Sequence, residues 1–438
     1  MAHVKKVFSM IRILLAIAVA ATFGFDIAEG APATTQAGVK AFPTAEGFGA
    51  VARGGREGRV LFVTNLNDEG PGSLREAVET RGPRTIVFRV GGTIRLKKRI
   101  EVREPFVTIA GQTAPGEGIC LANYEFYIRT NDAVVRHLRV RPGDVSPGER
   151  DAITIRECDR VIVDHCSASW SIDELLSTTK AKNVTVQWCL ITEALHNTHH
   201  HKGNHGFGSL IQCDGASYHH NLYAHNRSRN PRPASGLIDF RNNVIYDWDR
   251  MAGYAEDNQQ RLNYIENWLA PGPSTNSGRE TAFHTGKSKS TIYFRDNVLD
   301  GVVGDGEDDR KIINVRNGGQ VAQDEFSVAP VKTDTATAAR QRVLEGAGAT
   351  RPVRDVIDAR VVDSVRQRSG RQIDSQNDVS GWVELKSGAA PADADDDGMP
   401  DVWEKQKGLN PADASDASAD RNGDGYTNLE EYLNELAP

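Results

Sequence analysis

Long apolar runs are almost absent from this sequence, and the one that is present lies near the N terminus. Residues 13–25 are almost wholly apolar, they follow Lys5, Lys6 and Arg12, and small residues lie at positions 28, 30 and 31. An apolar run this short, with basic residues before it, is typical of a secretory signal rather than a membrane span. We therefore expect residues 1–30 to be a signal peptide. The mature protein should be soluble and secreted, with the periplasm and the cell surface as alternative locations.

Cysteine is also scarce. The five cysteines lie at positions 120, 158, 166, 189 and 213. Their odd number gives no clean disulfide framework, and no CxxC pair has the spacing of a zinc site. We expect mostly buried free thiols, with at most one or two disulfides.

A strong excess of one charge is absent from most of the chain. Residues 393–438 contain thirteen Asp and Glu against three Lys and Arg, a net charge of −10. The remaining residues carry a net charge of +3, although the whole chain has −7. The acidic tail and the faintly basic body therefore need separate explanations.

A repeat of short strands runs through the middle of the sequence. Each rung has an apolar or small residue at its start and an apolar residue two positions later, and the starts are 22 to 32 residues apart. The rungs start at Val107, Ala133, Val161, Val184, Ala216, Ile238, Leu262 and Ile292. This alternation predicts strands, and the long spacing requires each strand to pair in parallel with the next after a full circuit.

These features predict an all-β parallel β-helix, whose coils stack about 4.8 Å apart. Short strands without intervening amphipathic helices argue against a doubly wound fold. Five residues after the rung start, from the second rung on, an inward column contains Leu138, Cys166, Cys189, Asn221, Asn243, Asn267 and Asn297. The asparagine amides of this column should hydrogen-bond along the stack as a ladder.

The flanking segments complete the predicted domain organisation. Strands at 60–63 and 85–88 begin a β-helix domain of residues 41–330, together with a helix at 73–80 whose Ser73 and Glu76 fit a capping box. Helical segments at 335–346 and 353–368 belong to a C-terminal extension, residues 331–386. We expect them to flank the last coil and cover its sheet edge. Residues 387–392 form a small flexible linker to the acidic segment 393–438.

Charged loops break the repeat in consecutive coils. Asp151 precedes one strand and Asp173 follows another. A long loop at residues 196–208, which we call the excursion, contains Lys202, and a proline-constrained turn contains Arg229. Because coils stack in register, Asp173, Lys202 and Arg229 can share one face within about 10 Å. Carboxylates at one end suit a hard cation such as Ca²⁺, and the cationic side chains suit the carboxylates of a polyanion.

Several separated motifs stand out: DHCS at residues 164–167, the loop at Asp173, RNPR at 229–232, AFPTAEGFG at 41–49, VTNLND at 63–68 and GPGSLR at 70–75. Together they resemble polysaccharide lyase family 1, the pectate lyases. The resemblance covers residues 41–385, with the motifs in the right order. It implies a right-handed parallel β-helix, a pectin-lyase-like solenoid, which agrees with the repeat.

The resemblance also implies a calcium-dependent lyase that cleaves de-esterified homogalacturonan by β-elimination. Arg229 matches the base that removes the C5 proton, and Arg232 and Lys202 match groups that bind substrate and assist catalysis. We add Arg227 as a further substrate-binding candidate. Because free arginine is protonated, a base at Arg229 requires burial and neighbouring cations to lower its pKa.

The calcium ligands implied by the resemblance are Asp151 and Asp173, with Glu174 and Glu149 as nearby candidates. Two positions depart from the family pattern. Ser177 stands where many relatives have a further aspartate, and Ala234 stands where the family often has an arginine. These departures concern the affinity for calcium or substrate rather than the reaction class.

Two other functions stay open. One is a non-catalytic β-helix that binds acidic polysaccharide, and the other is a galacturonan hydrolase, which needs paired carboxylates facing the sugar. The cationic partners Lys202 and Arg229 favour elimination. We expect a monomer that binds pectate, with no nucleic-acid or membrane partner once the signal peptide is removed.

Histidines gather in the excursion, at positions 199, 200, 201 and 205. Three adjacent histidines point in different directions, and no cysteine or carboxylate stands at a useful sequence spacing, so we do not expect zinc. His165 in the DHCS motif should be structural, hydrogen-bonded to neighbouring coils.

The acidic tail contains two EF-hand-like loops with Gly398 and Gly425 at the sixth position. The loop positions that supply ligands hold Asp393, Asp395, Asp397, Met399, Asp401 and Glu404, and then Asp420, Asn422, Asp424, Tyr426, Asn428 and Glu431. Oxygen ligands at these offsets wrap one Ca²⁺ per loop. Short helices at 402–407 and 429–436 should follow. The pair resembles dockerin-like or thrombospondin-type-3-like modules, which implies structural calcium or docking to a cell-surface or scaffold partner.

Overall fold

The structure is a computed structural model that describes residues 38–437 apart from 256–257, 287–288 and 317. The predicted signal peptide, residues 1–30, lies outside the described residues. Among the described residues, no helix has both the length and the apolar character needed to cross a membrane. Residues 39–438 form one structural unit, and every element named below belongs to it.

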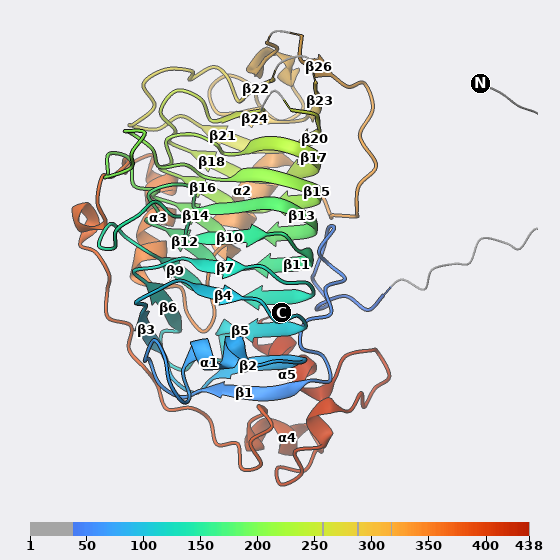
Figure 1. The fold of residues 1–438 in the computed structure, drawn as a ribbon. Helices are drawn as coiled ribbons and strands as arrows, with labels where there is room; N and C mark the ends of the chain where they lie inside the picture. Colours follow the sequence, from blue (N-terminus) through green and yellow to red (C-terminus); the bar gives the residue numbers. More distant parts are fainter. Residues whose placement is uncertain (1–37, 256–257, 287–288, 317, 438) are drawn as a thin grey trace, which may run out of the picture. The chain divides into compact units, whose positions relative to one another are not determined.

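Parallel strands stack into a β-solenoid of about ten turns (Figure 1). One side is a fourteen-stranded sheet. Its main path is β1 (Arg59–Val63), β2 (Arg84–Phe88), β5 (Val107–Ala110), β8 (Ala133–Arg136), β11 (Asp159–Asp164), β13 (Leu176–Gln187), β15 (Leu210–His219), β17 (Arg232–Arg241), β20 (Gln260–Ile265), β23 (Ser290–Arg295) and β26 (Gln320–Val321). A branch is formed by β4 (Ile100–Val102), β7 (Phe126–Ile128) and β10 (Ile153–Arg156).

A second side of the solenoid is a nine-stranded parallel sheet. Its strands are β3 (Gly92–Arg95), β6 (Ile119–Ala122), β9 (Arg139–Arg141), β12 (Ser167–Ser169), β14 (Leu190–Thr192), β16 (Leu222–Ala224), β18 (Val244–Tyr246), β21 (Trp268–Ala270) and β24 (Val298–Leu299). A small sheet joins β19 (Gly253–Tyr254), β22 (Phe283–His284) and β25 (Ile313–Asn314). Short 3-10 turns are η1 (Gly111–Thr113), η2 (Asp309–Ile312), η3 (Gln376–Val379) and η4 (Asp416–Ser418).

The strand register confirms the repeat that the sequence predicts. Val161 pairs with Ala133 on one side and with Val184 on the other, and each later rung start pairs with the next. These side chains are buried inside the solenoid. Because a one-residue slip would turn every inward side chain outward, the alternating pattern fixes this register.

The asparagine column forms the predicted ladder. The side-chain amide of Asn221 donates to Asn243 over 2.9 Å, Asn243 donates to Asn267 over 3.1 Å, and Asn267 donates to Asn297 over 3.0 Å. Each amide also bonds to a main-chain carbonyl, so polar groups at the bends between the two large sheets are satisfied inside the solenoid. All five cysteines are buried free thiols, as predicted.

The first helix and its cap agree with the sequence in part. α1 (Leu74–Glu79) begins after Ser73, whose hydroxyl accepts from the Glu76 N–H. The Glu76 carboxylate accepts from the N–H of Gly72 rather than from that of Ser73. The reciprocal half of the predicted capping box is therefore displaced by one residue.

The helices of the C-terminal extension were predicted to cover the edge of the last coil, but the structure places them elsewhere. α2 (Ala336–Gly346) and α3 (Val356–Gln367) pack against the outer face of the nine-stranded sheet (Figure 1). Val343 and Val361 from these helices join one buried cluster with Leu222 and neighbouring outward side chains of the sheet. The outward face of that sheet is apolar, and covering it removes more apolar surface from water than covering one strand edge would.

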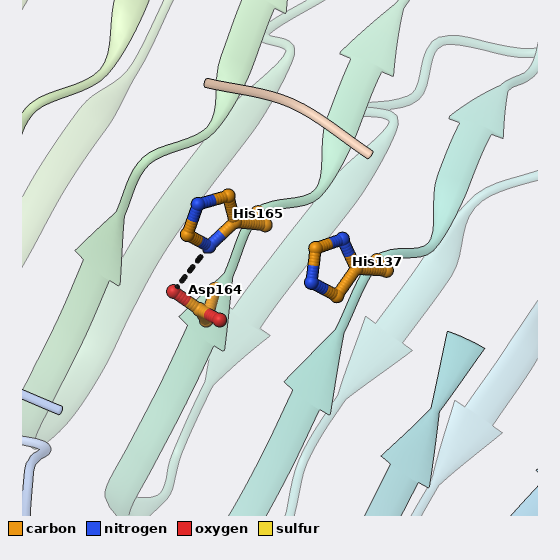
Figure 2. A group of neighbouring side chains, drawn as sticks. All are labelled: His137, Asp164 and His165. Carbon is orange, nitrogen blue, oxygen red and sulfur yellow. Dashed lines mark hydrogen bonds and ion pairs between the residues drawn. The ribbon is translucent and has the colours of Figure 1, made fainter. Parts of the chain in front are cut away.

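Asp164 and His165 of the DHCS motif contact side chains of neighbouring coils. Figure 2 shows His165 beside His137 at the bends of neighbouring coils, with Nδ1 of His165 2.8 Å from Oδ1 of Asp164. The His165 ring stacks on His137 and on Trp188, with ring centroids 5.0 and 5.9 Å apart. Asp164 also accepts from Arg136, at 2.8 Å. His165 lies in a bend with φ of 49°, between β11 and β12.

The C-terminal module (residues 393–437) packs on the first coils of the solenoid. Its helices are α4 (Asp401–Lys407) and α5 (Asn428–Leu436), which confirm the two helices predicted after the acidic loops. Residues 387–392 run exposed between the extension and the module. The hydroxyl of Ser387 accepts from the N–H of Gly91 in the first coils.

Candidate active site

Main-chain contacts hold the charged loops of consecutive coils together. Phe207, at the end of the excursion, forms parallel bridges with Glu174 on one side and with Ser228 on the other. The N–H of Phe207 donates to the Asp173 carbonyl over 3.0 Å, and the N–H of Ser209 donates to the Arg229 carbonyl over 2.7 Å. The loops that the sequence predicts to share one face are therefore adjacent.

A glycine permits this close approach. A Cβ on Gly208 would lie 2.6 Å from the Arg229 carbonyl oxygen and 2.3 Å from Oδ1 of Asn230, which real Cβ atoms do not tolerate. The turn at residues 229–232 is also bonded to the next coil, because the N–H of the buried Asn230 donates to the Ala252 carbonyl over 2.9 Å. The peptide bond between Asn230 and Pro231 is cis.

Three carboxylates meet at one end of the site. Oxygens of Asp151, Asp173 and Glu174 lie within 4.8 Å of one another. Asp151 accepts from the Thr154 hydroxyl at 3.1 Å and from the Glu174 N–H at 3.2 Å. Burial, together with the charge of Asp173, raises the pKa of Asp151 well above its ordinary range. A cation that approaches would therefore stabilise the charged form of this cluster.

Asp173 is positioned by a histidine of the excursion. Nε2 of the buried His205 lies 2.7 Å from Oδ1 of Asp173. Burial alone would raise the pKa of Asp173, but the hydrogen bond and charge of His205 and the charge of Arg229 lower it overall. Asp173 is thus held in its charged form, which is the form that binds a cation.

Arg229 lies between the carboxylates and an aromatic side chain. Its guanidinium forms an ion pair with the buried Glu174 and stacks over Phe207, with Cζ 3.8 Å from the ring centroid. Burial, with the nearby charge of Arg232, lowers the pKa of Arg229, although Tyr254 opposes the shift. The structure therefore supplies the direction of pKa change that a base at this position requires.

The other predicted cationic residues surround this centre at different depths. Arg232 begins β17, and its Cζ lies 5.7 Å from the Tyr254 ring centroid. Arg227 donates to the Asn204 carbonyl and lies 3.6 Å from Asp249. Lys202 is exposed at the tip of the excursion. Among the described residues, no hydrogen bond or ion pair joins its ammonium to another group.

The two departures from the family pattern are both buried. Ser177 lies on β13, where its hydroxyl contacts Asp151 and accepts from the Leu210 N–H at 3.3 Å. It therefore adds a hydrogen bond to the carboxylate cluster but no negative charge. Ala234 lies on β17 with 1% of its surface exposed, so this position offers no cation to a substrate.

The structure brings carboxylates to the histidines that sequence spacing did not connect. Nε2 of His200 lies 3.4 Å from Glu149 and 3.8 Å from Asp173. His201 hydrogen-bonds to Glu149. The rings of His200 and His205 stack with centroids 3.7 Å apart and planes 7° apart. An imidazole binds a metal ion in the plane of its ring, and the planes of these two stacked rings do not coincide. His200 and His205 therefore cannot both ligate the same ion unless one ring moves.

Sequence reasoning missed three contributors to the active site, which are His205, Phe207 and Tyr254. His205 was set aside because its carboxylate partner is on another coil, and Phe207 looked like an ordinary apolar residue. A signal was available for Phe207, since it ends the excursion directly before Gly208, the glycine on which the loop packing depends.

The first acidic loop of the C-terminal module contains a second group of buried carboxylates. We call Asp395, Asp397, Glu404 and Asp416 the buried carboxylate cluster. Each has at least one buried side-chain oxygen without a hydrogen-bond partner among the described residues. Burial and neighbouring carboxylates raise the pKa of Asp397 to about 7 and that of Glu404 to about 7. Asp416 lies between the two predicted loops and was not a predicted ligand.

The other predicted ligands of the first loop have protein partners. Asp393 pairs with Arg89 at 2.9 Å and accepts from the Gly398 N–H. Asp401 accepts from the Ala394 N–H at 2.8 Å. Met399, whose carbonyl the loop pattern assigns as a ligand, has a fully buried side chain.

The second acidic loop is more exposed and is hydrogen-bonded within itself. Asn422 donates to Asp424 and to Glu431, while Asp420 accepts from the N–H groups of two loop glycines. Asp424 also accepts from the Tyr426 N–H. Asn428 is buried and donates to the Asp416 carbonyl, which links the second loop to the buried carboxylate cluster.

Comparison with known proteins finds relatives along nearly the whole chain. A protein of Neosartorya fischeri named "Probable pectate lyase C" is 39% identical over 411 residues, which cover 91% of this chain and 94% of the relative. The protein of the same name in Emericella nidulans is 38% identical, with 91% and 93% covered. No protein-family model matches.

Two solved structures share the fold. A Bacillus sp. pectate lyase in complex with trigalacturonate is 17% identical with a TM-score of 0.52, covering 69% of this chain and 98% of that one. A Bacillus subtilis pectate lyase variant is 14% identical with a TM-score of 0.54, covering 72% and 98%. At these identities the likeness concerns the parallel β-solenoid alone.

Proposed function

The chain belongs to the pectate lyase family and is a polysaccharide lyase, and we propose that it cleaves de-esterified homogalacturonan by calcium-dependent β-elimination outside the cell. The products are unsaturated oligogalacturonides. One observation carries the proposal: the largely buried guanidinium of Arg229 lies directly beside the carboxylates Asp173 and Glu174. A hydrolase would instead need two carboxyl groups separated across the sugar, without an arginine between them.

Arg229 acts as the base in this proposal. It takes the proton from C5 of a galacturonate residue, the C4–C5 double bond forms, and the C4–O bond breaks. The departing oxygen then receives a proton. Burial against Phe207 and the charge of Arg232 both favour the neutral guanidine that the first step needs.

The arginine must also leave Glu174 before it can serve as a base, because an ion pair stabilises its protonated form. A second cation at the carboxylate cluster would compete for Glu174 and release the guanidinium. The mutual approach of Asp151, Asp173 and Glu174 to within 4.8 Å, with oxygen as the donor atom throughout, fits Ca²⁺. When bound, the ion would neutralise a substrate carboxylate and so acidify the C5 proton.

Substrate carboxylates are held by the cationic side chains around this centre. Arg232 begins β17, three residues after Arg229, and Arg227 lies two residues before Arg229. Lys202 lies at the exposed tip of the excursion. Planar guanidinium groups bind carboxylates through two hydrogen bonds, which suits repeated galacturonate units. Methyl-esterified pectin would offer these groups little to bind.

The proposed reaction is tested by incubating the full chain with polygalacturonate, with added Ca²⁺ or with EGTA. We expect ultraviolet absorbance from the unsaturated product with Ca²⁺ and its loss with EGTA. Reducing ends without absorbance would replace elimination with hydrolysis. Substrate binding without either signal would leave a non-catalytic binding protein.

We also propose that residues 1–30 direct secretion and that the protein acts as a monomer. The two acidic loops of the C-terminal module bind Ca²⁺ in addition to the ion at the active site. The buried carboxylate cluster supports this for the first loop, and the bonds that draw Asn422, Asp424 and Glu431 together support it for the second. A cell-surface or scaffold partner for this module can be sought by pull-down with cell-wall fractions.

A further inference from the structure

The C-terminal module shares an apolar cluster with the first coils of the solenoid. Met399 from the first acidic loop and Leu429, Tyr432 and Leu433 from α5 are buried together with Val87 of β2. Val60, Phe62 and Ala110 of the first coils complete the same cluster. The apolar side of α5 therefore packs against the solenoid of the same chain, so the module and the first coils share a hydrophobic core.

Polar contacts reinforce the same interface. The guanidinium of Arg56, which precedes β1, donates from Nε to both carboxylate oxygens of Glu430 on α5, each at 2.9 Å. Arg89 pairs with Asp393 at 2.9 Å and with Asp396 at 2.6 Å. Arg136, on β8, donates to the Ala437 carbonyl. The module is thus anchored to at least three coils.

The first acidic loop lies against β1 without space for a side chain. Gly398 has φ of 91°, and a Cβ at this position would lie 2.9 Å from Val60 of β1. The neighbouring Met399 fills the apolar cluster described above. Any change that orders this loop therefore also orders its contact with the first strand.

The same loop contributes most of the buried carboxylate cluster. Glu404 has no exposed surface and Asp397 has 2% exposed, yet three of their four oxygens have no hydrogen-bond partner among the described residues. Asp395 and Asp416 add further buried oxygens without partners. Burying several like charges without a counter-charge is strongly unfavourable, so a cation bound at this point would stabilise the folded module.

We propose that one calcium ion, bound by the buried carboxylate cluster, fixes the C-terminal module as a cap over the first coils of the solenoid. Asp416 is the ligand outside the EF-hand spacing, and it joins the first loop to the segment that leads into the second. The cap covers the outward apolar side chains of β1 and β2, the first strands of the larger sheet. The proposal rests on calcium binding by the acidic loops and does not depend on the lyase reaction.

Calcium binding itself is tested by isothermal titration of the full chain with CaCl₂. We expect Glu404→Gln to weaken one site by about tenfold or more, because the last loop position supplies the bidentate ligand. Glu435→Gln is the matched control, since Glu435 is an exposed glutamate of the same module. Equal calcium stoichiometry and affinity in the two variants would overturn the proposed site.

The cap is tested separately by hydrogen exchange of residues 59–63 and 84–88. We expect Ca²⁺ to slow exchange in these strands in the wild type and in Glu435→Gln, but not in Glu404→Gln. Calcium binding that leaves the exchange of both strands unchanged would overturn the cap while retaining the ion site. Asp151→Asn, which alters only the active-site carboxylates, should keep the calcium response of β1 and β2.

Thermal unfolding gives an independent sign test. In EGTA, Glu404→Gln should unfold at a higher temperature than the wild type, because one buried like charge is removed. In Ca²⁺ the order should reverse, because the variant lacks a ligand. A variant that is less stable than the wild type under both conditions would contradict the proposed role of Glu404.

Discussion

Two acidic clusters in this protein are built from the same groups but are compensated differently. In the active site, His205 lies beside Asp173 and Arg229 forms an ion pair with Glu174, so the protein supplies partners to two of the three carboxylates. In the C-terminal module, the buried carboxylate cluster has buried oxygens with no partner among the described residues. A metal ion could replace the protein partners of the first cluster, whereas under our proposal the counter-charge of the second comes from an ion in solution.

This difference matches the two roles. In the proposed mechanism Arg229 leaves Glu174 when substrate and metal bind, and the internal ion pair compensates the buried charge until then. A structural site has no step to perform, so its free energy can come entirely from the bound ion. The pKa directions agree: the hydrogen bond from His205 and the charge of Arg229 lower the pKa of Asp173 against the effect of burial, whereas burial raises that of Glu404 to about 7.

The largest expected effect is on the base. Arg229→Ala should lower kcat by about a thousandfold, within the range that a positioned general base contributes. The measurement is the initial rate of unsaturated product at saturating substrate and Ca²⁺. Arg227→Ala is the control at a neighbouring arginine and should act mainly on KM. Retained kcat in Arg229→Ala would remove Arg229 from the role of base.

The next effect separates calcium affinity from stability in the active-site cluster. Asp151→Asn should raise the Ca²⁺ concentration needed for half-maximal activity by about a hundredfold, because fewer carboxylates weaken such sites. It should also raise Tm in EGTA, since burial and Asp173 disfavour the charge on Asp151. Asp214→Asn, at an exposed position on β15, should change neither quantity. An unchanged calcium requirement would exclude Asp151 as a ligand.

A smaller effect is expected from the histidine that holds Asp173. His205→Ala should lower kcat/KM by about tenfold, as is typical for a residue that orients a metal ligand. His205→Gln keeps a hydrogen-bond donor and should recover part of the loss, which a purely structural role would not predict. His199→Ala, in the same excursion but exposed, is the control. Equal losses in His205→Gln and His205→Ala would argue against positioning through the hydrogen bond.

The smallest effect is a pH dependence of stability that calcium should abolish. The pKa values of Asp397 and Glu404 are raised to about 7 from ordinary values of 3.8 and 4.5. The folded chain therefore binds more protons than the unfolded chain in this window, and its stability falls as pH rises through it. In EGTA, Tm should fall between about pH 5 and about pH 8 through this contribution. Comparison with Glu404→Gln isolates it, and an identical pH slope in that variant would contradict the assignment.

Sequence reasoning located the coils well because their pattern is periodic. The register that pairs Val161 with Ala133 and Val184 follows from side chains that alternate inward and outward. The asparagine ladder follows from one polar residue that recurs at the same offset. The helices α2 and α3 were recognised as helices, but their packing against the nine-stranded sheet was not, because periodicity describes an element and not its partner.

The sequence by itself determined the solenoid, the order of its coils, and which loops carry charge, since each depends on local spacing. Only the tertiary structure decided which charges meet. His205 reaches Asp173 and Arg229 reaches Glu174 across coils of different length, and Asp416 joins the buried carboxylate cluster from outside the loop pattern. These contacts depend on how irregular loops pack over regular strands, and desolvation then fixes the charge states of the two acidic clusters.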